Sequence, residues 1–183
     1  MNSQLPRDVV HRWSEECAAQ GLAFQSIARR LVEDQSRLGR FFKANIPQMP
    51  GQSGEVALYL LAVVIRLFEK GGGRLGRVGT KEIDAATAKI QSHAKGLRPG
   101  EEGFADRVRA VADRAQPHIL DEALHALLER EEKKDEEVEM SPADGALVFL
   151  MLWAATEALE LAWKAPANPE WAIPAPDSPE ASA

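Results

Sequence analysis

The chain has 183 residues, of which 45% are hydrophobic and 27% are charged, and its formal net charge is -6 at pH 7. This length accommodates one domain with a sizeable core, within the composition range of ordinary globular proteins. The negative balance argues against general affinity for nucleic acid or for an anionic membrane. The single cysteine, Cys17, excludes an intrachain disulfide and a thiolate zinc cluster.

The apolar runs of the sequence are too short to predict a membrane span. The longest are VALYLLAVVI, which ends at Ile65, and GALVFLMLWAA, which ends at Ala155. Both are shorter than the ~20 residues that a transmembrane helix requires. The first residues, MNSQLPRDVV, contain no apolar run of the length found in signal peptides. We therefore expect a soluble, cytoplasmic protein without a membrane partner.

Helical spacing of apolar residues begins near the N-terminus. From Leu5, which precedes Pro6, apolar residues recur in steps of four and predict a first helix that ends near Gly21: Leu5, Val9, Trp13 and Cys17. A second helix carries one apolar face made of Phe24, Ile27, Leu31, Leu38 and Phe42. Asp34 and Gln35 interrupt that face, so we expect one polar side chain to point inward there. The segment NIPQMPGQSG then ends this helix, because prolines and glycines cannot continue it.

The third predicted helix is capped by Ser53 and is apolar nearly all round from Val56 to Phe68, as expected of a central element. Its polar exceptions fall on one line: Glu55, Tyr59, Arg66 and Lys70. Such a line is either a solvent-facing seam or satisfied polar network, or the wall of a pocket in which Arg66 anchors an anion.

Four further helices complete the predicted fold. They span residues 80–95, capped by Thr80, then 104–111, 117–128 and 141–164. In the last of these, Ser141 is the expected cap, and Glu157 and Glu160 are expected on the exposed side. The charge run EREEKKDEEVE between the last two helices predicts a solvated final turn and linker.

These elements predict an all-α, single-domain helical bundle of about seven helices without a sheet. The helical domain covers residues 1–164, and residues 165–183, APANPEWAIPAPDSPEASA, predict a Pro/Ala-rich flexible tail. Six side chains of the two most apolar helices are expected to be almost fully buried: Leu60, Val64, Phe68, Leu147, Met151 and Leu159.

The stretch GGGRLGRVGTKE, residues 71–82, is the candidate phosphate site. A phosphate-binding P-loop requires a Gly-Lys pair between a strand and a helix. Here Gly76 precedes Arg77, Gly79 precedes Thr80, and the segment before the loop is helical. The loop is interpreted as a connector, with an anion-binding corner as the alternative. The corner would use four basic residues near the amino end of the next helix, together with Arg66: Lys70, Arg74, Arg77 and Lys81.

Candidate metal ligands lie on one face of the helix over residues 117–128. His118, Glu122, His125 and Glu129 fall within about 60° of one another, opposite the leucines. Glu122 and His125 have the Glu-x-x-His spacing of di-metal bundles, which need a second such pair that the sequence lacks. The prediction is a solvated face with no metal, and the remaining histidines, His11 and His93, are isolated.

Catalytic patterns are equally sparse. Cys17 lies on the apolar line of the first helix, which predicts a buried, inert thiol, and no Gly-x-Ser-x-Gly elbow is present. No motif predicts a cofactor. The sequence does not favour an enzyme, although that class stays open.

Trp171 and the neighbouring Ile173 are the apolar residues of the predicted tail. They either fold back on the bundle or insert into a partner. The function that we expect is an acidic helical protein–protein interaction module: an adaptor, a regulator or a neutralising partner of another protein. Homo-oligomerisation is left open. The alternatives are a phosphate-containing ligand binder or enzyme that uses the loop and Arg66, and a nucleic-acid-binding regulator, which the net charge disfavours.

Overall fold

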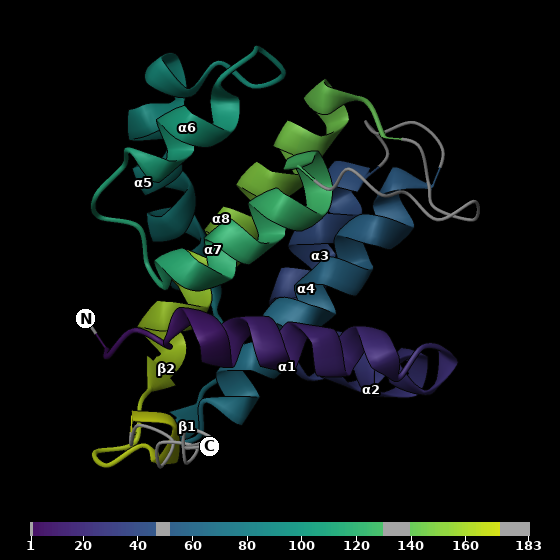
Figure 1. Ribbon diagram of the computed structural model, residues 1–183, viewed down its shortest axis with the longest axis vertical. Coiled ribbons are helices and arrows are strands. Elements are labelled where there is room, and N and C mark those ends of the chain that lie inside the picture. Colours follow the sequence, from purple (N-terminus) through teal and green to yellow (C-terminus); the bar gives the residue numbers. More distant parts are fainter. Residues whose placement is uncertain (1, 47–51, 130–139, 173–183) are drawn as a thin grey trace, which may run out of the picture.

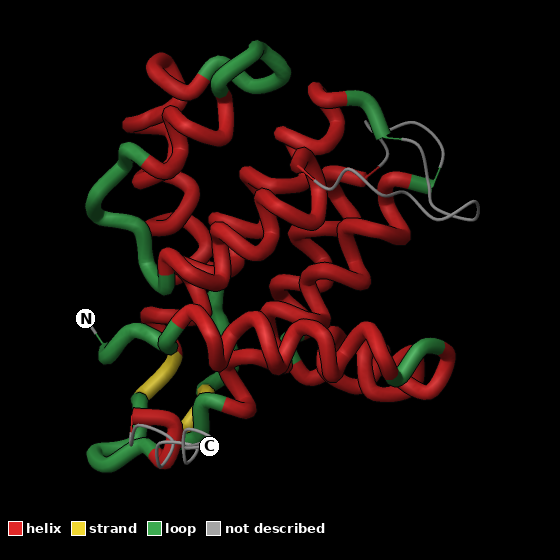
Figure 2. Tube along the Cα trace, in the orientation of Figure 1, coloured by secondary structure: helices red, strands yellow, loops and turns green. Residues whose placement is uncertain are grey.

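The computed structural model of the protein describes residues 2–46, 52–129 and 140–172. Over these ranges the chain forms eight α-helices and a single pair of short strands (Figures 1 and 2). The predicted all-α class is therefore confirmed. Most of the predicted charged linker, the prolines of the predicted break after the second helix, and the part of the predicted tail from Ile173 onward lie outside the described residues.

The elements follow one another in an order close to the predicted one. The helices are α1 (Arg7–Ala19), α2 (Leu22–Asp34), α3 (Ser36–Asn45), α4 (Ser53–Lys70), α5 (Thr80–Leu97), α6 (Phe104–Arg109), α7 (Pro117–Leu124) and α8 (Pro142–Ala162). The chain continues from α7 into a π-helical turn, His125–Glu129, and a 3-10 turn is formed by Glu170–Ala172. Ser141 caps α8 as predicted, whereas Gln52 and Gly79 occupy the cap positions predicted for Ser53 and Thr80.

The strand pair corrects the expectation that the fold has no sheet. β1 (Arg74–Leu75) pairs antiparallel with β2 (Trp163–Lys164), which directly follows α8. Gly72 and Gly73 have positive φ values of 76° and 71°, a conformation that residues with a Cβ rarely adopt. These glycines turn the chain after α4 so that it runs beside the end of α8, a pairing that local sequence cannot predict.

Helix α8 occupies the centre of the molecule. It packs against α5 on one side and against α4 and α7 on the others (Figure 1). By length and composition it alone among the described helices could cross a membrane, but 78% of its apolar window is buried inside the protein. Its apolar character is therefore that of a core helix: Phe149 and Trp153 are fully buried there and contact each other.

The second predicted helix is broken in two at Gln35. The backbone of Gln35 leaves the helical region, with φ -98° and ψ 51°, and separates α2 from α3. Its buried side chain accepts a hydrogen bond from the Val78 N–H and donates one to the carbonyl of Gly76, both at 2.9 Å. The inward polar group expected at this point is confirmed, and it binds the glycine loop to the bundle.

Four of the six predicted core residues are almost fully buried: Val64, Phe68, Met151 and Leu159. Leu60 is only half-buried, and the prediction for Leu147 is wrong, because 43% of its surface is exposed. Leu147 lies over a small hollow of about 190 Å³ between α3, α5 and α8, where Phe41 and Ile90 leave the side of α8 uncovered.

The expected exposure of two glutamates on α8 is also wrong. Glu157 and Glu160 are both buried. Glu157 accepts hydrogen bonds at 2.9 Å from the Lys89 ammonium, the Ala115 N–H and the Trp153 indole N–H. Burying a carboxylate is costly unless it is paired and hydrogen-bonded, and these donors supply the pairing. The spacing of residues along α8 could not predict this burial, because the hydrogen-bond donors Lys89 and Ala115 come from distant segments of the chain.

Glu160 joins the N-terminus of the chain to the end of α8. Its carboxylate accepts hydrogen bonds from the backbone N–H of Asn2 at 2.7 Å, from the Asn2 side-chain amide at 3.0 Å and from Gln116 at 3.0 Å. Asn2 also donates to the Trp163 carbonyl and accepts from the Ala165 N–H. The two ends of the helical domain are thereby fastened together at one buried group.

Burial along α8 gives a direct test of this core. Leu152 is fully buried and Leu147 is not, so Leu152→Ala is expected to lower the free energy of unfolding by about 2–5 kcal/mol. Leu147→Ala, the matched change one and a half turns away, is expected to cost about 0.5 kcal/mol or less. Urea denaturation followed by circular dichroism measures both, and similar losses for the two variants would contradict this assignment of the core.

Candidate functional site

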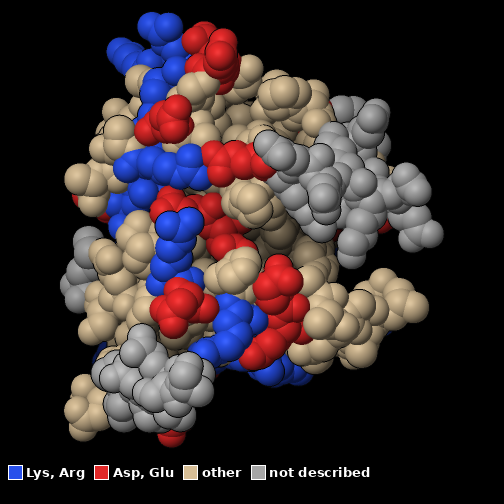
Figure 3. Space-filling view, in the orientation of Figure 1, with Lys and Arg blue, Asp and Glu red and all other residues tan. Residues whose placement is uncertain are grey.

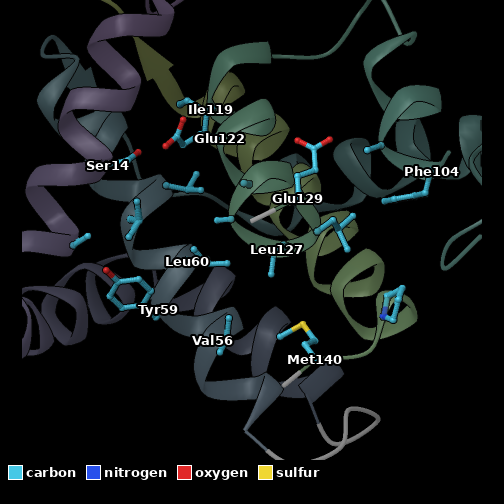
Figure 4. Close-up of a pocket in the computed structure, with 18 of the residues that line it drawn as sticks. Ser14, Val56, Tyr59, Leu60, Phe104, Ile119, Glu122, Leu127, Glu129 and Met140 are labelled. Carbon is cyan, nitrogen blue, oxygen red and sulfur yellow. The ribbon is translucent and has the colours of Figure 1, made fainter. Parts of the chain in front are cut away.

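A pocket lies between α1, α4 and the α7–π-turn segment (Figure 4). Its volume is about 750 Å³, within the range that ligand sites occupy. The start of α6 and the residues that precede α8 close its far end, through Phe104 and Met140. No residue of the glycine loop lines it.

The floor of the pocket is apolar and comes mostly from α4. Val56, Leu60 and Val63 line it, with Ile119 and Leu127 opposite (Figure 4). Because α4 is apolar nearly all round, one of its faces packs on α8 while a second faces this pocket. This explains why Leu60, which was predicted for the core, is half-buried: its side chain belongs to the pocket wall.

The π-helical turn shapes the opposite wall. An α-helix that widens for five residues rotates the side chains that follow, and such turns are frequent at functional sites. Here the turn follows the last residue of α7, and Ala126, Leu127 and Leu128 line the pocket together with Glu129. The leucines of this turn are half-buried: they pack against the edge of the core and also line the pocket.

Four glutamates stand around the pocket, and no lysine, arginine or histidine is among its described lining residues. The glutamates are Glu15, Glu101, Glu122 and Glu129. Glu122 contacts Nδ1 of His11 at 3.1 Å, and Glu129 makes two bonds of 2.7 Å to the Arg109 guanidinium. The hydrogen bonds from Arg109 hold the pKa of Glu129 below its ordinary value, so this carboxylate is ionised at neutral pH.

Two hydroxyl groups complete the pocket. The Oγ of Ser14 is buried without a hydrogen-bond partner, and its side chain lies at the same end of the pocket as Glu122 (Figure 4). Tyr59 packs edge-on against Phe24, and burial raises its pKa, so the phenol is neutral at physiological pH. Because Ser14 Oγ makes no hydrogen bond, the His11–Glu122 pair is not coupled to it as the base of a nucleophile.

Two of the five residues predicted for an anion-binding corner are engaged in ion pairs. Arg66 binds Glu69 at 2.8 Å, and Lys70 pairs with Glu16 above the ring of Trp13. Arg74, Arg77 and Lys81 are exposed, in β1, in the loop and in the first turn of α5. The predicted polar line on α4 is thus divided between ion pairs and the rim of the pocket, where Tyr59 lies.

The amino end of α5 already holds a carboxylate. Glu82 accepts a hydrogen bond of 2.9 Å from the N–H of Gly79, which closes a reciprocal cap at this helix end. The hydroxyl of Thr80 accepts a bond from Arg37 at 2.8 Å. An incoming phosphate would meet the charge of Glu82 where the helix favours a negative group. The geometry supports the connector interpretation of the loop.

The candidate metal ligands separate in the structure. Glu122 contacts His11, Glu129 pairs with Arg109, and His125 is exposed. Among the described residues no group of three or more His, Cys, Asp or Glu side chains is arranged to hold a metal ion. The face expected to be merely solvated instead carries two of the pocket's carboxylates. His11, interpreted as isolated, makes a hydrogen bond of 3.1 Å to one of them, Glu122.

Cys17 is buried as predicted, and burial raises the pKa of its thiol. A thiol with a raised pKa is a poor nucleophile at neutral pH. Cys17 also lies outside the pocket lining.

The first part of the predicted tail is attached to the glycine loop. The indole N–H of Trp171 donates to the Gly71 carbonyl at 2.9 Å, and that of Trp163 donates to Gly72 at 2.8 Å. Trp171 is half-buried and packs against the core. The flexible segment expected from residue 165 therefore begins with ordered chain. Ile173 lies outside the described residues, and partner binding by Trp171 and Ile173 stays a prediction.

Comparison with protein-family models, with curated proteins and with solved structures found no match to this chain.

The pocket itself was not found by reasoning from the sequence. Its walls come from three helices whose apolar residues are all counted toward a core when each helix is taken alone. The sequence feature that could have predicted the pocket is the apolar character of α4, which extends over more faces than one neighbouring helix can cover.

The attachment of Trp171 to the glycine loop can be tested by substituting this residue. Trp171→Ala removes a half-buried ring and one hydrogen bond, so it is expected to lower the free energy of unfolding by about 1–2 kcal/mol. The melting temperature should fall by roughly 2–4 °C per kcal/mol. A variant that ends at residue 172 keeps both interactions and is the control. An unchanged melting temperature for Trp171→Ala would contradict the packing described for this ring.

A second test addresses the glycine loop. Because Glu82 occupies the amino end of α5, inorganic phosphate is expected to change the melting temperature of the wild type and of Arg74→Ala/Arg77→Ala equally. Thermal unfolding in phosphate and in chloride of matched ionic strength measures this. Stabilisation by phosphate of the wild type alone would restore the anion-binding alternative.

Proposed function

We propose that the protein is a non-enzymatic interaction module that receives an apolar helical segment of another protein in the pocket between α1, α4 and α7. The observation that carries this proposal is the pocket of about 750 Å³ with its floor of α4 side chains. Amphipathic helices bind in hydrophobic grooves of this kind, with residues spaced at i, i+3, i+4 and i+7 as anchors.

The chemistry of the pocket favours binding over catalysis. Its polar side chains among the described residues are carboxylates, one serine and one tyrosine. The carboxylates at the two ends, Glu122 and Glu129, each contact a cationic or titratable side chain outside the pocket. Ser14 has no base within hydrogen-bond distance. These groups can orient a bound segment, whereas the apolar floor supplies the contact area.

The helical walls also suit a helical guest. The α4 wall presents Val56, Leu60 and Val63 or Val64 at spacings of three and four residues, so its side chains form a ridge along the helix. A second helix packs on such a ridge by placing its own side chains in the neighbouring grooves. A partner helix laid along α4 would cover the leucines of the π-turn at the same time.

The test uses a synthetic helical peptide of about 18 residues, with leucines at i, i+3, i+4 and i+7, glutamine elsewhere and an uncharged fluorophore. We expect saturable binding in fluorescence polarisation. Leu60→Glu, which places a charge on the pocket floor, should weaken binding about tenfold or more. Leu22→Glu is the matched control, because Leu22 is 81% exposed and lies outside the pocket.

Circular dichroism verifies that both variants remain folded, and Tyr59→Glu at the pocket rim provides a second disruptive change at a more exposed site. Absence of saturable binding to the wild type, or equal binding by the pocket variants and the Leu22→Glu control, would refute the proposal.

A further inference from the structure

We infer that the segment received by the pocket is basic as well as apolar, and that Glu15 and Glu122 select it. This inference rests on the proposed function and names the chemical class of the partner. It follows from the distribution of charge around the apolar floor.

The charged side chains among the described lining residues of the pocket are all acidic. Its described lining residues include four glutamates and no basic side chain, although the chain as a whole carries 22 lysines and arginines against 28 acids. The general acidity of the protein is too small to account for that asymmetry. On the face shown in Figure 3, acidic side chains lie over both α1 and α7, with lysine and arginine side chains between them that are not part of the described pocket lining. A complementary partner therefore carries lysine or arginine beside its apolar anchors.

The carboxylates come from walls of the pocket other than α4. Glu122 and Glu129 lie on the α7 side together with Ile119 and Leu127, whereas Val56, Tyr59 and Leu60 lie on the α4 side (Figure 4). A bound segment that matches this arrangement has an apolar face toward α4 and the leucines of the π-turn, and basic residues at the edge that meets the carboxylates. This is the pattern of a basic amphipathic helix.

The spacing of the carboxylates is also helical. Glu122 and Glu129 are seven residues apart along α7 and the π-turn, which corresponds to about 10 Å along the axis. Cations separated by two turns on a partner helix that runs beside α7 would reach both. Glu15 adds a third carboxylate from α1, the helix that packs against α7.

The three carboxylates are not equally available. Glu129 is held in two short hydrogen bonds by Arg109. Glu122 contacts only the exposed ring of His11 at 3.1 Å. Glu15 is exposed, and none of the ion pairs among the described residues involves it. A partner's cation therefore gains most at the Glu15–Glu122 end, next to the unpaired hydroxyl of Ser14, and least at Glu129.

The experiment compares three labelled peptides that share the leucine face of the test above and carry lysine, glutamine or glutamate on the polar face. We expect the lysine peptide to bind tighter than the glutamine peptide by about two- to thirtyfold, the range for two exposed charge pairs. The glutamate peptide should bind most weakly. Raising the salt concentration from about 50 mM to about 500 mM should remove most of the difference, because exposed charges are screened.

Substitutions of the pocket glutamates test which carboxylates produce the preference for the lysine peptide. Glu15→Gln/Glu122→Gln should bring the affinity for the lysine peptide close to that for the glutamine peptide, so that the ratio of the two affinities approaches one. The control, Glu33→Gln/Asp84→Asn, removes the same number of charges from exposed acids on α2 and α5 and should preserve the preference. Glu129→Gln should weaken binding of the lysine peptide less than Glu122→Gln does.

The outcomes separate the two proposals. If the glutamine and lysine peptides bind the pocket equally well, the inference is wrong and the interaction module stands. If no peptide binds, the proposed function fails and the inference with it. If both double variants lose the preference equally, net charge explains it and the inference is wrong. Binding of dodecyltrimethylammonium, with no peptide binding, would assign the pocket to a small cationic amphiphile and overturn the inference.

Discussion

The arrangement of the molecule depends on two carboxylates buried in its most apolar helix. Glu157 and Glu160 lie on α8 among side chains that exclude water, where an unpaired charge would cost several kcal/mol. Their donors come from α5, from the chain before α7 and from the N-terminus: Lys89, Ala115, Gln116 and Asn2. Each of these segments must therefore reach α8 at one place, which is a stronger positional requirement than apolar packing alone imposes. Apolar contact is non-directional, whereas a hydrogen bond fixes both distance and angle.

This requirement extends from the core to the pocket through Gln116. The residue stands immediately before α7, and its side chain donates to Glu160 while accepting a bond of 2.9 Å from the N–H of Leu5, just before α1. Its backbone has a φ of 43°, an uncommon conformation for a residue with a Cβ, which persists when surrounding contacts over-determine it. One side chain thus sets where both α1 and α7 begin. Those helices are two walls of the pocket, so the hydrogen bonds of the buried Gln116 side chain fix the distance between the two walls. Neither helix covers the apolar face of α4 that forms the pocket floor.

The sequence predicted the elements of this fold better than it predicted their relations. Helical periodicity located α1, α4 and α8, the cap at Ser141 and the inward turn of Gln35, because these depend on residues close together along the chain. It placed Glu157 and Glu160 in solvent, Leu147 in the core and no strand beside the glycine loop. Each of those errors concerns a partner from a distant segment: the donors to the glutamates, the missing cover over Leu147, and the chain after α8. Of the pocket, the sequence marked Glu122 and Glu129 only as part of a solvated face, with a metal site as the disfavoured alternative, and gave no indication of its apolar floor.

The acidic rim bears on whether the apolar pocket of one chain can associate with that of a second copy. Exposed apolar patches tend to associate, and a second copy of this chain would offer an equally apolar pocket. Placed pocket to pocket, however, two copies would bring together two sets of glutamates at Glu15, Glu101 and Glu122 without additional cations, since no basic side chain is among the described lining residues. Like charges so confined oppose association most strongly where water is being excluded. In the complex proposed above, the same carboxylates would lower the free energy of binding a basic segment. Repulsion between copies and attraction of a cationic partner would then be two consequences of one charge distribution, and the hydrogen bond of Glu122 to His11 and the ion pair of Glu129 with Arg109 moderate its strength.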